Sequence, residues 1–108
     1  IDQVFTNLIL NACHAISGSS LNGGTLTIKT RRGTRDDIEA VISDTGHGIS
    51  EDVVRRIFDP FFTTKPPGVG TGLGLSVSYG IMKEHDGEIS VESEPGKGAS
   101  FTVRIPLQ

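Results

Sequence analysis

The stretch Asp44-Thr45-Gly46-His47-Gly48-Ile49 places an acidic residue and two glycines at the end of an apolar run. Val41 and Ile42 come directly before it and predict a strand that is buried, so we expect the Asp44 carboxylate to be sheltered from water. A second glycine-rich stretch, Gly70-Thr71-Gly72-Leu73-Gly74-Leu75, opens a predicted helix further along the chain. Each stretch alone is a weak signal, but in this order and spacing they predict a pocket for an adenine nucleotide.

The rest of the chain alternates between helical and strand-like patterns around these two loops. Apolar residues recur at helical spacing near the N-terminus and in alternation in four other segments. We expect helices over 2–17, 51–57 and 72–86, strands over 25–30, 38–43, 88–94 and 99–106, a turn over 33–37, a tight hairpin turn at 95–98 and a loop over 59–71. This order predicts an α+β fold: a two-layer α/β sandwich whose mixed, mostly antiparallel sheet carries its helices on one face.

Length and composition limit the classes of protein that this chain can belong to. Its 108 residues predict a single domain over 1–108. Its net charge of −3 argues against a general nucleic-acid binder. The lone Cys13 excludes an intrachain disulfide, and no apolar run approaches the ~20 residues that span a bilayer. Because the only methionine is Met82, we expect this chain to be a domain of a longer protein. No signal peptide is visible, so we expect the domain to be cytoplasmic, and the full-length protein can still be anchored in a membrane.

The first predicted helix carries a polar stripe. Asn7, Asn11 and His14 are spaced four and three residues apart, so they share one face of an otherwise apolar helix. An asparagine carboxamide oxygen is a hard, neutral ligand that suits Mg²⁺. The alternative is that these side chains cap nearby backbone or face water.

The Asp44 loop has its own chemical reading and a rival. A sheltered carboxylate can accept a hydrogen bond from the exocyclic amine of adenine, whereas guanine presents a carbonyl there. Gly46 and Gly48 would let the base approach the backbone, and Ile49 would supply an apolar wall. Asp-Thr-Gly is also the signature of aspartic proteases. The glycine-rich loop at 70–74 has no role in a protease, and a simple strand-to-helix turn is the remaining alternative.

The second loop and the segment before it predict a phosphate site. Glycines at the start of a helix leave backbone N–H groups exposed to an anion. The pattern is neither that of a dinucleotide-binding fold nor that of a P-loop. Between the two loops, Phe58, Phe61 and Phe62 can anchor a lid from which Lys65 and the adjacent threonines reach phosphate oxygens.

Taken together, these motifs resemble the catalytic ATP-binding domain of sensor histidine kinases, within the GHKL superfamily. The resemblance covers nearly the whole chain and includes five boxes in the family's order. They are the N box (7–12), the G1 box (44–49), the F box (58–62), the G2 box (70–75) and a final glycine box (96–101). The run Phe61-Phe62-Thr63-Thr64-Lys65 is similar to kinases of the nitrogen-regulation type.

The resemblance implies a role for each matching residue. Asn11 would be the Mg²⁺ ligand with Asn7 beside it, Asp44 would bind the adenine amine and Lys65 would touch the β- or γ-phosphate. Asn7, Asn11 and Lys65 would carry the catalysis. The nucleotide-binding set would be Asn11, His14, Asp44, Gly46, Gly48, Ile49, Phe62, Thr64, Lys65, Gly70, Thr71, Gly72, Leu73, Gly74, Leu75 and Thr102. Three departures stand out: His14 replaces a frequent Lys or Arg, Ala15 replaces a tyrosine that packs on adenine, and strand material before the first helix is missing.

Within the superfamily, the resemblance favours a kinase over an ATPase. The ATPases carry a water-activating glutamate four residues before the Mg²⁺ asparagine, where this chain has Asn7. The γ-phosphate would then go to a histidine on a separate dimerisation domain of the same protein, and from there to a response regulator. The full-length protein would be a homodimer and this chain alone a monomer. The alternatives are a GHKL-type ATPase and a nucleotide-sensing module without transfer activity.

Overall fold

A computed structural model of the 108-residue chain describes residues 2–19, 24–33, 36–59 and 74–107. These residues form three helices and four strands. In chain order they are α1 (Asp2–Ser19), β1 (Leu26–Arg32), β2 (Asp37–Asp44), α2 (Glu51–Val54), α3 (Gly74–Glu84), β3 (Glu88–Glu94) and β4 (Gly98–Pro106). None of the described helices combines the length and the apolar character that crossing a bilayer requires.

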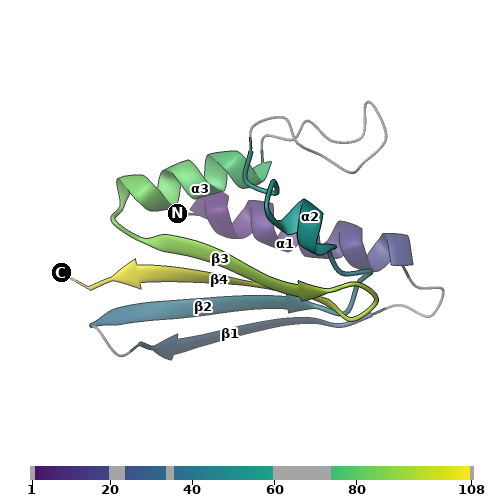
Figure 1. The fold of residues 1–108 in the computed structure, drawn as a ribbon. Helices are drawn as coiled ribbons and strands as arrows, with labels where there is room; N and C mark the ends of the chain where they lie inside the picture. Colours follow the sequence, from purple (N-terminus) through teal and green to yellow (C-terminus); the bar gives the residue numbers. More distant parts are fainter. Residues whose placement is uncertain (1, 20–23, 34–35, 60–73, 108) are drawn as a thin grey trace.

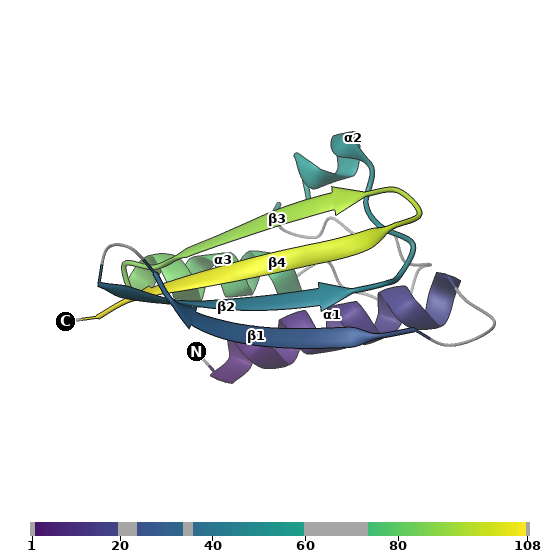
Figure 2. The ribbon, with the colours of Figure 1, turned by 90° about the horizontal axis from the view of Figure 1, so that it is seen from below.

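The four strands form one sheet in the order β1-β2-β4-β3, and α1 and α3 cover one of its faces (Figures 1 and 2). The predicted two-layer α+β architecture is therefore confirmed. All three strand pairings are antiparallel, so within the described residues the sheet is antiparallel throughout rather than mixed. In the register, Asp44 at the end of β2 lies opposite Leu26 of β1 on one side and Ala99 of β4 on the other.

The core lies between the helices and the covered face of the sheet. On α1, the predicted apolar stripe supplies Val4, Leu8 and Ala12, each at most 2% exposed. The sheet contributes alternate residues, of which Ile42 and Phe101 face each other across β2 and β4 and are 1% exposed. This alternation fixes which side chains of each strand point to the helices and which point to the open face.

Several element boundaries differ from the expected ones, among them those of α2, β2 and α3. Helix α2 ends at Val54 and continues as turns to Phe58. Ser50 caps its start, because the Ser50 hydroxyl accepts a hydrogen bond from the Val53 N–H. Strand β2 begins at Asp37, which the sequence pattern assigns to the turn. Helix α3 ends at Glu84 because Asp86 takes a left-handed conformation, with φ of 59°, and the Gly87 N–H bonds back to the Met82 carbonyl.

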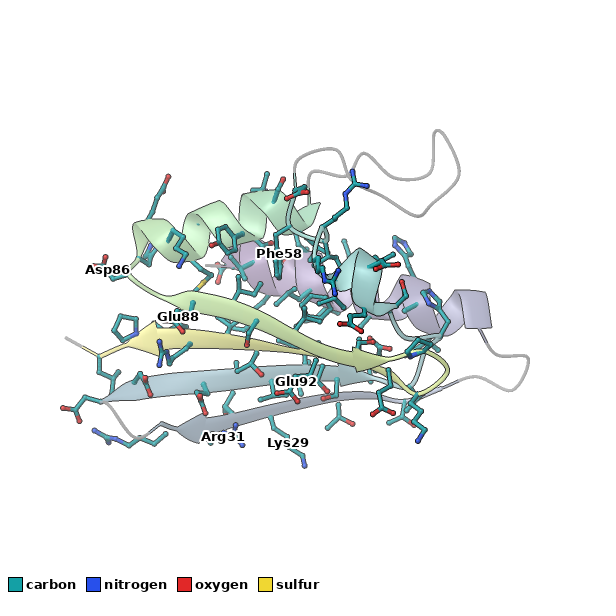
Figure 3. All side chains as sticks on the ribbon, in the orientation of Figure 1. Lys29, Arg31, Phe58, Asp86, Glu88 and Glu92 are labelled. Carbon is teal, nitrogen blue, oxygen red and sulfur yellow. The ribbon has the colours of Figure 1, made fainter. Side chains whose placement is uncertain are left out.

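The open face of the sheet is polar and carries a row of alternating charges. Arg31, Glu39, Arg104 and Glu88 follow one another across the register of β1, β2, β4 and β3. Arg31 pairs with Glu39 at 2.8 Å, and Arg104 pairs with Glu88. Arg31 of β1 and Glu88 of β3 are labelled in Figure 3. Arg31 lies in this row on the edge strand β1, with 66% of its side chain exposed.

Candidate functional site

Asp44 occupies the sheltered position that the sequence predicts. It is the last residue of β2, on the covered face of the sheet, and it is only 6% exposed. The hydrogen bond that the described residues give its carboxylate is from the Gly46 N–H to Oδ1, at 2.8 Å. This bond holds the carboxylate at the mouth of the loop that follows and satisfies one of its two oxygens.

The loop over residues 44–49, called here loop 44–49, is packed against α1. A Cβ atom built on Gly46 would lie 2.7 Å from the backbone carbonyl oxygen of Ala15. Only glycine permits this approach. The contact brings the loop to the turn of α1 that carries His14, one turn beyond Asn11.

The structure assigns the two glycines of the loop a packing role. We expected Gly46 and Gly48 to let a base approach the backbone. The space where their side chains would stand is filled by protein: Ala15 at Gly46, and the Glu94 carbonyl at Gly48, which has φ of 75°. The glycines therefore allow the loop to be held between α1 and the end of β3.

A second anchor ties the loop to the start of β1. The Thr45 N–H donates to the Thr25 carbonyl at 3.2 Å, and the Thr25 N–H donates to the Thr45 hydroxyl at 2.8 Å. This reciprocal pair fixes the residue directly after Asp44. The backbone that follows the Asp44 carboxylate is thus tied to the residue before β1 by two hydrogen bonds.

The polar stripe of α1 borders α3. Asn7 and Asn11 are half-buried and His14 is exposed. Asn7 donates from Nδ2 to the hydroxyl of Ser78 on α3 at 3.1 Å, and Ser78 is 0% exposed. The alternative that these asparagines simply face water therefore does not hold for Asn7.

The apolar residues predicted around the pocket lie on the core. Ile49 and Leu75 are half-buried and pack against the core cluster. Phe58 stacks on Tyr79 of α3, with ring centroids 5.4 Å apart, and meets Phe101 of β4 edge-on at 6.4 Å. Phe58 is thus packed against the core (Figure 3), whereas Phe61 and Phe62, the other two predicted anchors, lie outside the described residues.

Several predicted site residues fall outside the described part of the chain. Gly74 is the first residue of α3. The predicted site residues that lie outside the described part are Phe62, Thr64, Lys65, Gly70, Thr71, Gly72 and Leu73.

Thr102 is the predicted site residue that the structure does not bring to the others. It lies in β4 between Phe101 and Val103, which are 1% and 0% exposed and point to the helices. Alternation along the strand therefore places Thr102 on the open face of the sheet, opposite to Asp44. The expectation that Thr102 binds nucleotide is not supported by this placement.

Two serines at the site were missed by the sequence reasoning. Ser78 bonds to Asn7, and Ser93 of β3 bonds to the backbone of Ile49. A signal for Ser93 exists in the alternation of β3, which points it to the same face as Ile89 and Val91. A polar residue on the covered face of a strand needs a hydrogen-bond partner.

The fold and this arrangement define an ATP-binding domain of the histidine kinase type, and the family comparison agrees. The whole chain, residues 1–108, matches the family described as "Histidine kinase-, DNA gyrase B-, and HSP90-like ATPase". The chain belongs to that family.

The individual proteins that this chain is similar to include sensor histidine kinases and sporulation kinases. The chain is similar to sensor histidine kinase ZraS of Salmonella typhi, with 43% identity over 107 residues, which are 99% of this chain and 22% of that protein. It is also similar to sporulation kinase E of Bacillus subtilis, with 41% identity over 108 residues, which are 100% of this chain and 14% of that protein. The chain therefore spans only about a fifth or less of these relatives.

Solved structures show the same fold. The catalytic domain of histidine kinase ThkA, in a nucleotide-free form, superposes with a TM-score of 0.77 at 34% identity, over 96% of this chain and 64% of that one. A mycobacterial sensor histidine kinase, MprB, gives a TM-score of 0.80 at 26% identity, over 96% of this chain and 68% of that one.

Proposed function

We propose that this chain binds Mg-ATP and presents its γ-phosphate to a histidine on a separate domain of a two-component sensor kinase. The observation that carries the proposal is Asp44. Its carboxylate is 6% exposed and fixed through one oxygen by the Gly46 N–H, at the junction of loop 44–49 with the sheet. A carboxylate held in this way can accept a hydrogen bond from the exocyclic amine of adenine through its other oxygen.

The metal in this proposal is held mainly by the nucleotide. The described residues contain no group of three or more His, Cys, Asp or Glu side chains that could hold an ion. Mg²⁺ keeps several waters and is commonly bound through one or two protein oxygens together with substrate phosphates. The half-buried Asn11, beside the contact between α1 and loop 44–49, supplies such an oxygen.

A kinase is favoured over an ATPase by the residue at position 7. A positioned general base contributes typically about 10²–10⁴-fold to the rate, and an asparagine amide cannot serve as one. The Asn7 amide instead donates its N–H group to Ser78. We infer that transfer to a histidine, which relies on positioning and charge neutralisation, is the reaction that this site serves.

The partners follow from that reaction and from the relatives. The acceptor histidine lies on a dimerisation domain of the same full-length homodimeric protein, and a response regulator receives the phosphoryl group afterwards. We do not assign the acceptor role to His14, His47 or His85. His14 is exposed on α1, His47 bonds through Nδ1 to the Gly48 carbonyl at 2.6 Å, and His85 bonds through Nδ1 to the Ile81 carbonyl at 2.9 Å.

Nucleotide titration followed by calorimetry tests the binding part of the proposal. We expect ADP and ATP to bind the purified chain and GTP to bind much more weakly. Asn11→Ala should abolish the dependence of ATP affinity on Mg²⁺, and Asp44→Asn should weaken adenine binding about 10–100-fold, as expected when a hydrogen bond to a charged group is lost. Glu84→Gln makes the same chemical change at an exposed position near the end of α3 and serves as the control.

Phosphoryl transfer is tested separately. With γ-labelled ATP, the full-length protein should incorporate label in an acid-labile form, and this chain alone should neither label itself nor turn ATP over quickly. Rapid hydrolysis by the chain alone would instead support an ATPase. Adenine-selective binding without any transfer by the full-length protein would support a nucleotide-sensing module.

A further inference from the structure

The turn between β3 and β4 lies directly against loop 44–49. This segment, residues 93–98 and called here the β3–β4 turn, touches the loop at both of its ends. The Gly96 N–H donates to the His47 carbonyl at 2.7 Å. A side chain on Gly48 would clash with the Glu94 backbone, and a side chain on Gly98 would clash with the Asp44 carbonyl.

Ser93 joins these contacts through a single hydroxyl. Its Oγ accepts a hydrogen bond from the Ile49 N–H at 2.7 Å and donates one to the Gly98 carbonyl at 2.8 Å. Ile49 is the last residue of loop 44–49, and Gly98 is the residue packed on the backbone of Asp44, the first. The Ser93 hydroxyl therefore connects the two ends of the loop through the β3–β4 turn.

Only a hydroxyl can make this connection at the position of Ser93. A hydroxyl group can donate one hydrogen bond and accept another. The Ser93 hydroxyl does both, and both of its partners are backbone groups. An alanine would leave the half-buried Ile49 N–H and the Gly98 carbonyl without this partner, which costs more than the bond itself contributes. Threonine keeps the hydroxyl and favours a strand.

We propose that Ser93 is a positioning residue for adenine recognition. It sets the shape of loop 44–49, and through the contact of Gly98 with Asp44 it fixes where the Asp44 carboxylate stands. Adenine selectivity then depends on a residue that does not touch the nucleotide. This inference rests on the proposed function, because it assumes that Asp44 recognises the adenine amine.

The proposal is tested by comparing two nucleotides that differ at the group Asp44 is proposed to read. ADP has the exocyclic amine, whereas inosine diphosphate has a carbonyl at that position. The ratio of their dissociation constants therefore reports the position of the Asp44 carboxylate, and a loss of folded protein lowers both affinities equally. The variants are Ser93→Ala, Ser93→Thr and the matched control Ser90→Ala, which removes an exposed hydroxyl from the same strand.

We expect Ser93→Ala to reduce the preference for ADP over inosine diphosphate about tenfold, the scale of one lost hydrogen bond to a charged group. Ser93→Thr should restore most of the preference, and Ser90→Ala should leave it at the wild-type value. An unchanged preference in a folded Ser93→Ala protein overturns the positioning role. Failure of the wild-type protein to prefer ADP would instead overturn the proposed function, so the two failures are distinguishable.

A second measurement tests the proposal on the wild-type protein, so it does not require Ser93→Ala to fold. Amide hydrogen exchange in the wild-type protein should show the Ile49 N–H protected, and saturating ADP should raise that protection at least about tenfold by rigidifying the loop, together with that of Gly96. Binding of ADP without any change at Ile49 would overturn the proposal.

Discussion

Asn7 of α1 donates a hydrogen bond from Nδ2 to the hydroxyl oxygen of Ser78 of α3 across 3.1 Å, although the two residues are 71 positions apart. Ser78 is 0% exposed, so its hydroxyl lies inside the contact between the two helices. The bond directs the nitrogen of the Asn7 amide toward α3. It also joins the helix that carries the asparagine stripe to the helix that follows the second glycine-rich loop.

Removal of the Ser78 hydroxyl should destabilise the protein by about 1–2 kcal/mol, because the hydrogen bond between Asn7 and Ser78 is lost from the contact between α1 and α3. We expect Ser78→Ala to lower the urea midpoint without changing the slope. In a double-mutant cycle with Asn7→Ala, the two effects should couple by at least about 0.5 kcal/mol. Ser90→Ala, at an exposed strand position, should change stability by less than about 0.5 kcal/mol. Additive effects in the cycle would show that the bond contributes nothing.

Two glycines should respond to alanine in opposite directions. Gly98 has φ of 90°, and a side chain there would clash with the Asp44 carbonyl, so Gly98→Ala should cost at least about 2 kcal/mol. Gly80 lies within α3, and among the described residues no atom outside its own stretch of helix backbone lies within 4 Å of an added Cβ, so Gly80→Ala should stabilise by up to about 1 kcal/mol. Thermal unfolding of both variants checks the pair. A stabilised Gly98→Ala protein would contradict the packing described for loop 44–49.

Substitutions of Asp86 should change the stability of the protein according to how well each new residue tolerates a left-handed backbone. Its φ is 59°, which costs a residue with a β-carbon roughly 1–2 kcal/mol and a β-branched one more. We expect Asp86→Gly and Asp86→Asn to retain or increase stability and Asp86→Val to lose at least about 1 kcal/mol. Ser90→Val introduces the same residue into an extended strand and should not destabilise. Chemical denaturation measures the series, and a neutral Asp86→Val would be inconsistent with this end of α3.

Loss of Arg104 should destabilise the protein more than loss of an exposed arginine, because Arg104 pairs with the buried Asp37. Asp37 is 5% exposed, its Oδ1 has no hydrogen-bond partner among the described residues, and the Arg104 Nε lies 3.6 Å from its Oδ2. Arg104→Met should therefore cost about 2–3 kcal/mol, since it leaves a buried carboxylate without its cation. Adding Asp37→Asn should recover part of the loss. Arg55→Met breaks only exposed pairs with Glu51 and Asp52 and should cost less than about 0.5 kcal/mol. Equal losses from the two arginine variants would show that burial of Asp37 is unimportant.

Most elements could be predicted because their signals are local. The apolar spacing of α1 and the alternation of β3 follow from contacts within a few residues, and both elements lie where expected. Element ends were less predictable. Helix α3 stops at Glu84 because Asp86 turns left-handed, and a short polar residue at that position does not reveal its own φ.

Some features of the candidate site could also be predicted from the sequence, and others could not. The burial of Asp44 could be predicted, because Val41 and Ile42 directly before it predict a buried strand. The assignment of Thr102 could not be checked from sequence alone, since it depends on which face of β4 meets the helices. Ser78 and Ser93 were missed because their partners, Asn7 and Ile49, are 71 and 44 positions away.

The sequence by itself determined the family, the order of the elements and the acidic residue at the end of β2, because each is written in motifs or periodicities of nearby residues. Only the tertiary structure decided how loop 44–49 is held. Its glycines meet backbone from α1 and from the β3–β4 turn, and its last amide meets the Ser93 hydroxyl. Such contacts join segments that are distant in the chain, and their geometry exists only once the sheet and the helices have packed.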